Sequence, residues 1–465
     1  MQNNEQINPN RILWVISMAA FLVPFMGSAI NLALPEISDQ FSLKAVTLTW
    51  ISTSYLISTA IFQIPFARIA DLIGRKKIFI IGILIFTVGT SLCGFAHSGI
   101  SLIIYRVLSG IGSAMIFGTS MAILTSVFPK NQRGKALGIN ATVVYASVAS
   151  GPFLGGFMTH YWGWQSIFFI GSFIGLVIII LAINFINGEW IEAKGEKFDW
   201  IGSVIYAIAI FGIIYGFSNL PQLMGFIWIA IGIIAFVLFV FQERHCKFPV
   251  YNLKLFKGNR VFLFSSLAAL INYAATYAIS FMISLYLQYI RGFDAHHAGL
   301  ILISSALVQS FCSFFAGRLS DKFSPFKLAT LGMSIIVAGL GGLIFLSTQT
   351  PIYLIIILLI FLGIGFGIFA SPNTNIIMSS VDKKNYGQAS ATTGTVRLVG
   401  QSFSMGIAAM AISTHVGSQK IVKETHVDFM NSIQMTFIVF FVLCLIGVYA
   451  STVSGKNGKF RPSEE

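Results

Sequence analysis

The chain has 465 residues, of which 56% are apolar and only 10% are charged, and its mean hydropathy is +0.82. A soluble domain carries roughly a quarter charged residues, so this chain has too few polar side chains to cover the surface of a soluble protein of its size. The composition excludes a cytosolic enzyme, a secreted domain and a disordered chain. It predicts a polytopic membrane protein whose main partner is the lipid bilayer.

The net charge of +13 has three candidate explanations: nucleic-acid binding, an anionic membrane surface, and the retention of basic loops on one side of a membrane. Nucleic-acid binding would need a basic domain outside the membrane, and no polar stretch is long enough to form one, so no nucleic-acid partner is expected. The four cysteines show no paired spacing. Neither a disulfide framework nor a zinc site is therefore expected.

A membrane-spanning helix needs about 20 mostly apolar residues, and the sequence holds fourteen such runs. They cover residues 11–34, 50–70, 78–96, 100–126, 137–158, 167–187, 201–220, 225–243, 260–288, 297–317, 326–347, 351–378, 388–412 and 432–453. The expected fold class is an all-α integral membrane protein with 14 transmembrane helices.

Basic residues are distributed unequally between the two sides that these spans define. The loops on the side of both termini hold 23 of the 29 Lys and Arg, the other side holds four, and Arg106 and Arg397 fall inside spans. This split predicts a plasma-membrane protein with both termini in the cytoplasm. All sixteen Asp and Glu lie in loops, in tails or at helix ends.

A charged motif after the second predicted helix recurs after the tenth, 250 residues later. Its members are Arg68, Asp71 and Lys77, and their counterparts are Arg318, Asp321 and Lys327. Such repeats are typical of secondary transporters with a substrate path between two bundles. Residues 1–190 and 250–465 are therefore expected to form two six-helix bundles, and residues 191–249 to form two inserted helices.

Four further sequence features add to this pattern. They are Ala67–Lys77 after the second predicted helix, Arg106–Ala114 in the fourth, Gly151-Pro152-Phe-Leu-Gly155-Gly156 in the fifth, and Phe198-Asp-Trp200-Ile-Gly202 at the start of the seventh. Together they resemble the major facilitator superfamily, and with fourteen spans the chain looks like its drug:proton antiporter-2 family. The resemblance implies a secondary transporter that exports drugs or other amphiphiles by alternating access, coupled to protons.

The cytoplasmic motif is interpreted as a gate. It comprises Arg68, Asp71, Gly74, Arg75 and Lys76, with Arg318 and Asp321 in the repeat. Asp71 can accept hydrogen bonds from helix N-terminal amides, or pair with an arginine, and so latch the two bundles. The alternative is that the basic residues only fix the topology. Gly74 allows a tight turn.

The second motif is expected to pack helices closely, because Gly151, Gly155 and Gly156 lack side chains and Pro152 bends the fifth helix. The resemblance adds that this packing limits leak and implies antiport.

One departure bears on the substrate. The drug antiporters usually carry an aspartate in the first helix, five residues before the asparagine that corresponds to Asn31, and Met26 stands there instead. A cavity with Arg106 and Arg397 and no acid would suit an anionic or neutral amphiphile better than a lipophilic cation. Either arginine could instead be structural and bond helix carbonyls.

The resemblance implies that helices one, two, four, five, nine, ten, twelve and thirteen line the cavity, and polar side chains within these spans are the candidates for substrate contact. The candidates are Asn31, Tyr55, Gln63, Arg106, Tyr145, Asn272, Tyr273, Gln309, Asn375, Arg397 and Gln401, with Tyr277 and Asn373 beside them. Each could equally form an interhelical hydrogen bond.

Three functions remain open at this stage. The first is a multidrug or amphiphile exporter coupled to protons. The second is an importer, facilitator or exporter of an anionic metabolite or lipid without an acidic proton carrier. The third, a membrane sensor, scaffold or enzyme, would need a soluble domain or a reactive cluster, and the sequence offers neither. A monomeric transporter with no enzymatic activity, cofactor or metal is therefore expected.

Overall fold

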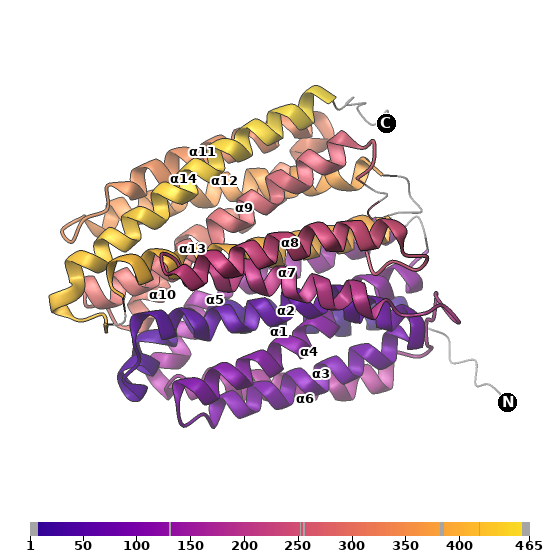
Figure 1. Ribbon diagram of the computed structural model, residues 1–465, viewed down its shortest axis with the longest axis horizontal. Helices are drawn as coiled ribbons and strands as arrows, with labels where there is room; N and C mark the ends of the chain where they lie inside the picture. The colour runs from indigo at the N-terminus through magenta and orange to yellow at the C-terminus, as the bar shows by residue number, and fades with distance from the viewer. Residues whose placement is uncertain are drawn as a thin grey trace.

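The computed structural model describes residues 8–129, 132–251, 253, 256–381, 386–417 and 419–457. Within these ranges it contains no strand, and fourteen helices are long and apolar enough to cross a membrane. The predicted all-α fold with 14 spans is therefore confirmed. Figure 1 shows the long helices running side by side, and the described part of the chain begins and ends at the same end of the molecule.

The helices fall into three consecutive groups along the chain. The first group is α1 (Pro9–Phe41), α2 (Ala45–Ile73), α3 (Arg75–Gly94), α4 (Gly99–Val127), α5 (Arg133–Trp162) and α6 (Gln165–Phe185). The second is α7 (Trp200–Ser218) and α8 (Leu223–His245). The third is α9 (Arg260–Leu285), the π-turn η2 (Tyr286–Ile290), α10 (Ala295–Lys322), α11 (Pro325–Ile344), α12 (Ile352–Ser379), α13 (Tyr386–His415), the 3₁₀ turn η4 (Lys423–Thr425) and α14 (His426–Asn457).

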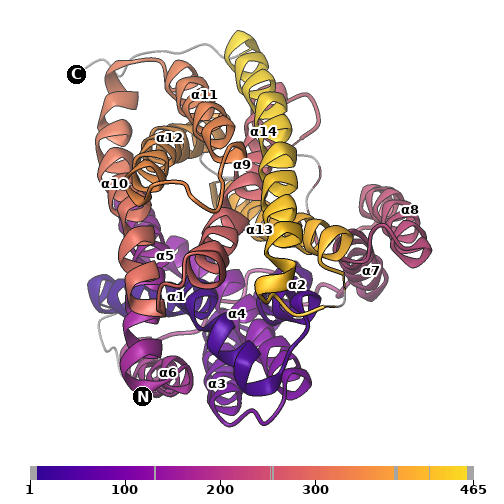
Figure 2. The same cartoon turned by 90° about the vertical axis from the view of Figure 1, so that its left-hand side faces the viewer.

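The first and third groups pack in the same pattern. α2 and α3 pack against α4, as α10 and α11 pack against α12. α1 packs against α5, and α3 against α6, as α9 packs against α13 and α11 against α14. The packing therefore repeats along the chain as the charged motif does. In Figure 2, α7 and α8 stand at the edge of the assembly, where α7 also contacts α2 and α13.

Glycines of the second motif bring α5 against two neighbours. A Cβ on Gly155 would lie 2.5 Å from the Ala29 carbonyl oxygen of α1, and one on Gly156 would lie 2.3 Å from the Ala295 carbonyl oxygen of α10. Backbone approaches of this kind have no room for a side chain. The motif thus packs α5 against its own group and against the third group, far from the chain ends.

Gly155→Ala tests this close contact. We expect the variant to lose about 1–3 kcal/mol of stability, because the added methyl group would collide with α1 backbone atoms that cannot move aside. The measurement is the melting temperature in detergent. Gly138→Ala is the matched control on the same helix, since nothing lies within 4 Å of its added Cβ. Equal melting temperatures for the two variants would contradict the packing role.

Candidate functional site

A cavity of about 1050 Å³ lies between the first and third groups and extends to the end that holds the chain termini. Residues of α2, α4, α5, α9, α10, α12 and α13 line it, together with Arg75 at the start of α3, Glu192 of the α6–α7 loop and residues 249–251 after α8. These are the expected helices except α1, which contributes no lining residue. Most of α1 is buried against its neighbours, chiefly α5 and α6.

Four of the predicted cavity residues line this cavity: Gln63, Tyr273, Asn375 and Arg397. The Arg397 guanidinium carbon lies 5.1 Å from the centre of the Phe117 ring, and among the described residues no carboxylate pairs with it. Gln63 is 5% exposed, and its buried Oε1 has no hydrogen-bond partner in the described part of the chain. Cavity groups of this kind are available to a ligand or to water.

The sequence did not single out several other lining residues. Phe117 of α4 and Asn140 of α5 both line the cavity, and the buried Oδ1 of Asn140 lacks a partner among the described groups. The first turns of α13 contribute a further polar surface: Gln388, Ser390, Thr392, Thr393 and Thr395. The signal for these was present, because Ser and Thr cluster in this stretch of an otherwise apolar span.

Arg106 was predicted as a cavity residue, and it is not among the residues that line this cavity. It is 1% exposed within the first group. Its Nε donates to the Ile51 carbonyl at 3.2 Å, its Nη1 donates to the Met26 carbonyl at 3.4 Å, and its guanidinium carbon stands 4.1 Å from the centre of the Tyr55 ring. Its Nη2 is buried without a hydrogen-bond partner among the described residues, and its other contacts are with helix carbonyls and the Tyr55 ring, as a structural role would require.

Tyr55 and Asn31 also serve helix packing and do not line the cavity. The Tyr55 hydroxyl donates to the Val23 carbonyl at 2.9 Å and lies 2.6 Å from Ser113 Oγ. Asn31 Oδ1 accepts from Ser52, and its carbonyl accepts from Ser284 of α9, both at 3.0 Å. The sequence could not place them, because a spanning helix presents polar side chains at every depth and on every face.

The remaining candidates either do not line the cavity or form hydrogen bonds between helices. Asn272, Gln309 and Gln401 do not line the cavity. Tyr277 donates from its hydroxyl to the Gly27 carbonyl at 2.8 Å, and Asn373 Nδ2 donates to the Ser265 carbonyl at 3.2 Å. The side chain of Tyr145 lies outside the described residues.

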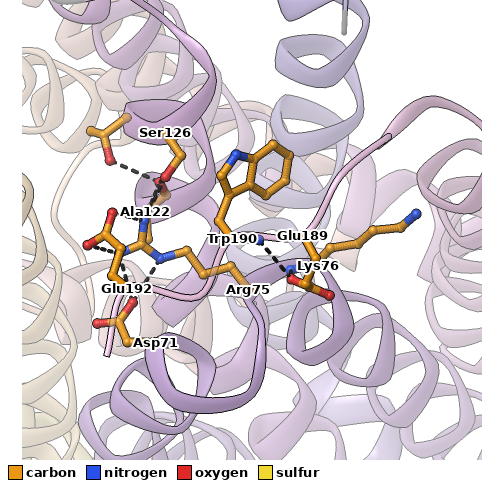
Figure 3. A network of polar contacts seen from close by, with 9 residues as sticks. Asp71, Arg75, Lys76, Ala122, Ser126, Glu189, Trp190 and Glu192 are labelled. Carbon is orange, nitrogen blue, oxygen red and sulfur yellow. Dashed lines mark hydrogen bonds and ion pairs between the residues drawn. The ribbon is translucent and has the colours of Figure 1, made fainter. Parts of the chain in front are cut away.

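A polar network surrounds Arg75 at the mouth of the cavity (Figure 3). Arg75 is 5% exposed, and its Nε donates to Asp71 Oδ1 at 2.8 Å. Its Nη1 donates to Glu192 Oε1 at 2.8 Å and to Ser126 Oγ at 2.6 Å. The loop from α6 to α7 thus holds the turn between α2 and α3.

Two other glutamates of the same loop also bind the region between α2 and α3. Glu189 accepts hydrogen bonds from the amides of Lys76 at 2.8 Å and Lys77 at 3.1 Å, at the positive end of the α3 dipole. Gly74 has φ +124°, and a Cβ there would lie 2.5 Å from the Glu189 carboxyl carbon. Glu196 pairs with Arg68.

The predicted gate therefore has a different arrangement in this conformation. Glu189, not Asp71, receives the helix amides, and Asp71 pairs with Arg75 inside the first group. A latch between the two bundles is not formed by these contacts. In the repeat, the Arg318 guanidinium carbon lies 4.3 Å from the centre of the Phe314 ring, and the side chain of Asp321 lies outside the described residues.

At the opposite end, charged groups join α5 to the start of α10. Asp294 accepts from the His297 amide and contacts His297 Nδ1, each at 2.8 Å, and its Oδ1 lies 4.0 Å from His160 Nδ1. Burial alone would raise the pKa of Asp294, but the His297 amide and imidazole and the charge of His160 outweigh burial and lower that pKa. The Asp294 carboxyl group is therefore favoured in its ionised form, at the end of the molecule opposite the cavity mouth.

Asp294→Asn tests that carboxylate. A lowered pKa in the folded state means that the carboxylate adds stability above its unfolded pKa of about 3.9, and that this stability disappears as the pH falls through the folded pKa. We expect a lower melting temperature for the variant at pH 6, and a difference from the parent protein that shrinks as the pH falls below the unfolded pKa and through the lowered folded pKa. A difference that stays constant over this whole pH range would count against a role for the charge.

Arg75→Gln tests the network at the cavity mouth. Loss of hydrogen bonds to charged groups is expected to cost about 1–3 kcal/mol, measured as a lower melting temperature. Lys76→Gln is the matched control, because only the backbone amide of Lys76 takes part. A control as destabilised as the Arg75 variant would argue against the network.

Comparisons with known proteins agree with this architecture. Over 85% of this chain and 86% of that protein, the chain is 28% identical to the riboflavin transporter RibZ of Clostridioides difficile (strain 630). It is 26% identical to the multidrug resistance protein Stp of Mycobacterium tuberculosis (strain CDC 1551 / Oshkosh), over 86% and 76% of the two chains. It is 25% identical to the methylenomycin A resistance protein of Bacillus subtilis (strain 168), over 88% of each.

Solved structures show the same fold. A bacterial homologue of the human lysosomal transporter Spinster, in an inward-facing and unoccupied conformation, superposes with a TM-score of 0.67 at 17% identity, over 99% of this chain and 100% of that one. The Escherichia coli xylose transporter XylE superposes with a TM-score of 0.64 at 14% identity, over 97% and 99%.

The sequence profile that matches the chain is that of the Major Facilitator Superfamily, over residues 16–405 and again over residues 265–465. The fourteen spans, the repeated packing and the cavity between the two groups agree with this match. The protein is a multi-pass membrane transporter, not an enzyme, and it belongs to the Major Facilitator Superfamily.

Proposed function

We propose that this protein is a secondary transporter of small amphipathic compounds that are neutral or anionic, and that it works by alternating access. The observation that carries the proposal is the charge of the cavity. Arg397 lines it with no carboxylate partner in the described residues, whereas the lining carboxylates Asp71 and Glu192 are both engaged by Arg75. An unpaired cation within a membrane span favours an anionic or hydrogen-bonding ligand.

The other lining groups suit the same ligand class. Phe117 offers an aromatic face beside Arg397, and Gln63 and Asn140 offer buried oxygens without partners among the described residues. Pockets that combine apolar walls with a few polar groups bind amphipathic ligands. The name of the relative RibZ supports this class, because riboflavin is a planar heteroaromatic compound without a permanent charge.

The moving parts of the proposed cycle are residues 1–190 and 250–465, with residues 191–249 as an insertion. The cavity opens at the end that carries the basic loops. The positive-inside rule assigns this end, with both termini, to the cytoplasm of the plasma membrane. The conformation described here is then open to the cytoplasm, and the α5–α10 contact closes the outer side.

A drug exporter coupled to protons is the second candidate function. The resistance proteins among the relatives favour it by name. Met26 stands where the drug antiporters usually carry the first-helix aspartate, and a methionine cannot bind or release a proton. Met26 is also 1% exposed, and its sulfur faces Gly171 of α6 rather than the cavity. Proton coupling would then need a titratable group elsewhere in the chain.

Arg397→Gln in proteoliposomes tests the proposal. Uptake of an anionic and of a cationic fluorescent amphiphile would be measured with and without a pH gradient. Loss of a charge-assisted hydrogen bond costs about 1.5–3 kcal/mol, so we expect the anion concentration that half-saturates uptake to rise about 10-fold or more. Arg260→Gln, at an exposed position outside the cavity, is the matched control.

Two results would overturn the proposed substrate class. One is transport of the cation, but not the anion, by the unmodified protein. The other is an Arg397→Gln variant that still carries the anion at the rate of the Arg260→Gln control.

A further inference from the structure

We propose that the inserted helices carry a proton-binding site, formed by the facing carboxyl groups of Asp199 and Glu243, whose occupancy acts on the wall of the transport cavity. The site itself stands on the geometry of α7 and α8. Its effect on transport rests on the proposed function.

Asp199 and Glu243 border the same small buried space. Asp199 caps α7, where its Oδ1 accepts from the Gly202 amide at 2.8 Å. A Cβ on Gly202 would lie 2.5 Å from Asp199 Oδ2 and 2.7 Å from Glu243 Oε1. This contact explains the glycine of the Phe198–Gly202 motif, because any side chain there would occupy the space between the two carboxyl groups.

One carboxyl oxygen of Glu243 has a hydrogen-bond partner, and the other has none among the described residues. The residue is 4% exposed, and its Oε2 accepts from the Tyr251 amide at 2.9 Å. Its Oε1 is buried and has no hydrogen-bond partner among the described residues. A buried acceptor without a partner is costly, and a proton held between Oε1 and the carboxyl group of Asp199 would remove that cost.

The surrounding groups do not neutralise both charges. Gln242 Nε2 lies 3.5 Å from both oxygens of Asp199 and is uncharged. Arg68 of α2 is the cation whose charge acts on Glu243, but it pairs with Glu196. The thiol of Cys246 is a further titratable group next to the pair, because it interacts with both Asp199 and Glu243, and Tyr206 lies near Tyr251. Because two carboxylates that border one buried space repel each other, a single proton shared between them would relieve that repulsion.

A chain of contacts connects the pair to the cavity. Glu243 holds the Tyr251 amide, and the Tyr251 hydroxyl donates to Thr392 Oγ1 of α13 at 2.6 Å. Pro249, Val250, Tyr251 and Thr392 all line the cavity. Burial raises the pKa of Tyr251 to about 12, so its hydroxyl remains a donor at neutral pH. Loss of the shared proton would place two negative charges next to this connection, and their repulsion would act on the cavity wall.

Infrared spectroscopy of the purified full-length protein in lipid nanodiscs tests the site without any substrate. The C=O stretch of protonated carboxyl groups would be followed between pH 5 and pH 9. We expect a band that persists at pH 7 in the unmodified protein and is lost in both Glu243→Gln and Asp199→Asn. Glu424→Gln, at an exposed glutamate, is the matched control and keeps the band.

The same spectra contain the results that would overturn the site. One is the absence of a protonated carboxyl band at pH 7 in the unmodified protein. Another is a band that survives both substitutions in variants with unchanged elution on size exclusion. A third is loss of the band on addition of Na⁺ or K⁺ at constant pH, which would assign the pair to a metal cation.

Transport assays then separate the site from its effect. Glu243→Gln keeps an oxygen for the Tyr251 amide and resembles the protonated pair, so we expect its transport rate to lose the pH dependence of the unmodified protein. An infrared band that behaves as expected, with unchanged pH dependence of transport, would retain the site and overturn the coupling. Failure of the Arg397 experiment would affect neither infrared result.

Discussion

Hydrocarbon offers no hydrogen-bond partner, so every polar group within the membrane must be satisfied by the protein, by water or by a ligand. Around α1, away from the cavity, several side chains answer this constraint by bonding to helix backbone, although Arg106 Nη2 has no partner among the described residues. α1 receives three of them on neighbouring carbonyls, since Tyr55, Arg106 and Tyr277 bond to the carbonyls of Val23, Met26 and Gly27 respectively. Pro35 cannot donate to the Asn31 carbonyl, and Ser284 of α9 donates to it instead.

The helices that line the cavity leave some polar groups without a partner in the described residues. Gln63 and Asn140 keep buried oxygens without partners in the described residues, and the Arg397 guanidinium lies near the Phe117 ring with no carboxylate partner among those residues. Satisfied polar groups hold helices together, and unsatisfied groups at a cavity mark where water or a ligand is needed.

The fold was largely predictable from the sequence, because the bilayer imposes the length and hydrophobicity of each span. The cavity was predictable only in part. Tyr55 and Gln63 lie on the same helix, yet Tyr55 bonds to α1 and Gln63 lines the cavity. Which face of a helix a side chain occupies depends on how the neighbouring helices pack. A membrane helix is apolar both toward lipid and toward protein, so its sequence pattern does not reveal which face lines the cavity. The glutamates of the α6–α7 loop were missed because the partner of a loop charge is set by tertiary contact.

The two kinds of contact made by α7 have a mechanical consequence. Its Tyr206 hydroxyl donates to the Ala60 carbonyl of α2 at 3.1 Å, whereas its Phe217 ring meets the Phe403 ring of α13 at 4.6 Å between centres. A hydrogen bond is directional and breaks when its partners shift, but two apolar rings can slide over one another with little change in energy. If the two bundles rock against each other, the ring contact of Phe217 can therefore slide along α13, whereas the hydrogen bonds of Tyr206 to α2 and of Tyr251 to Thr392 of α13 must either hold or break.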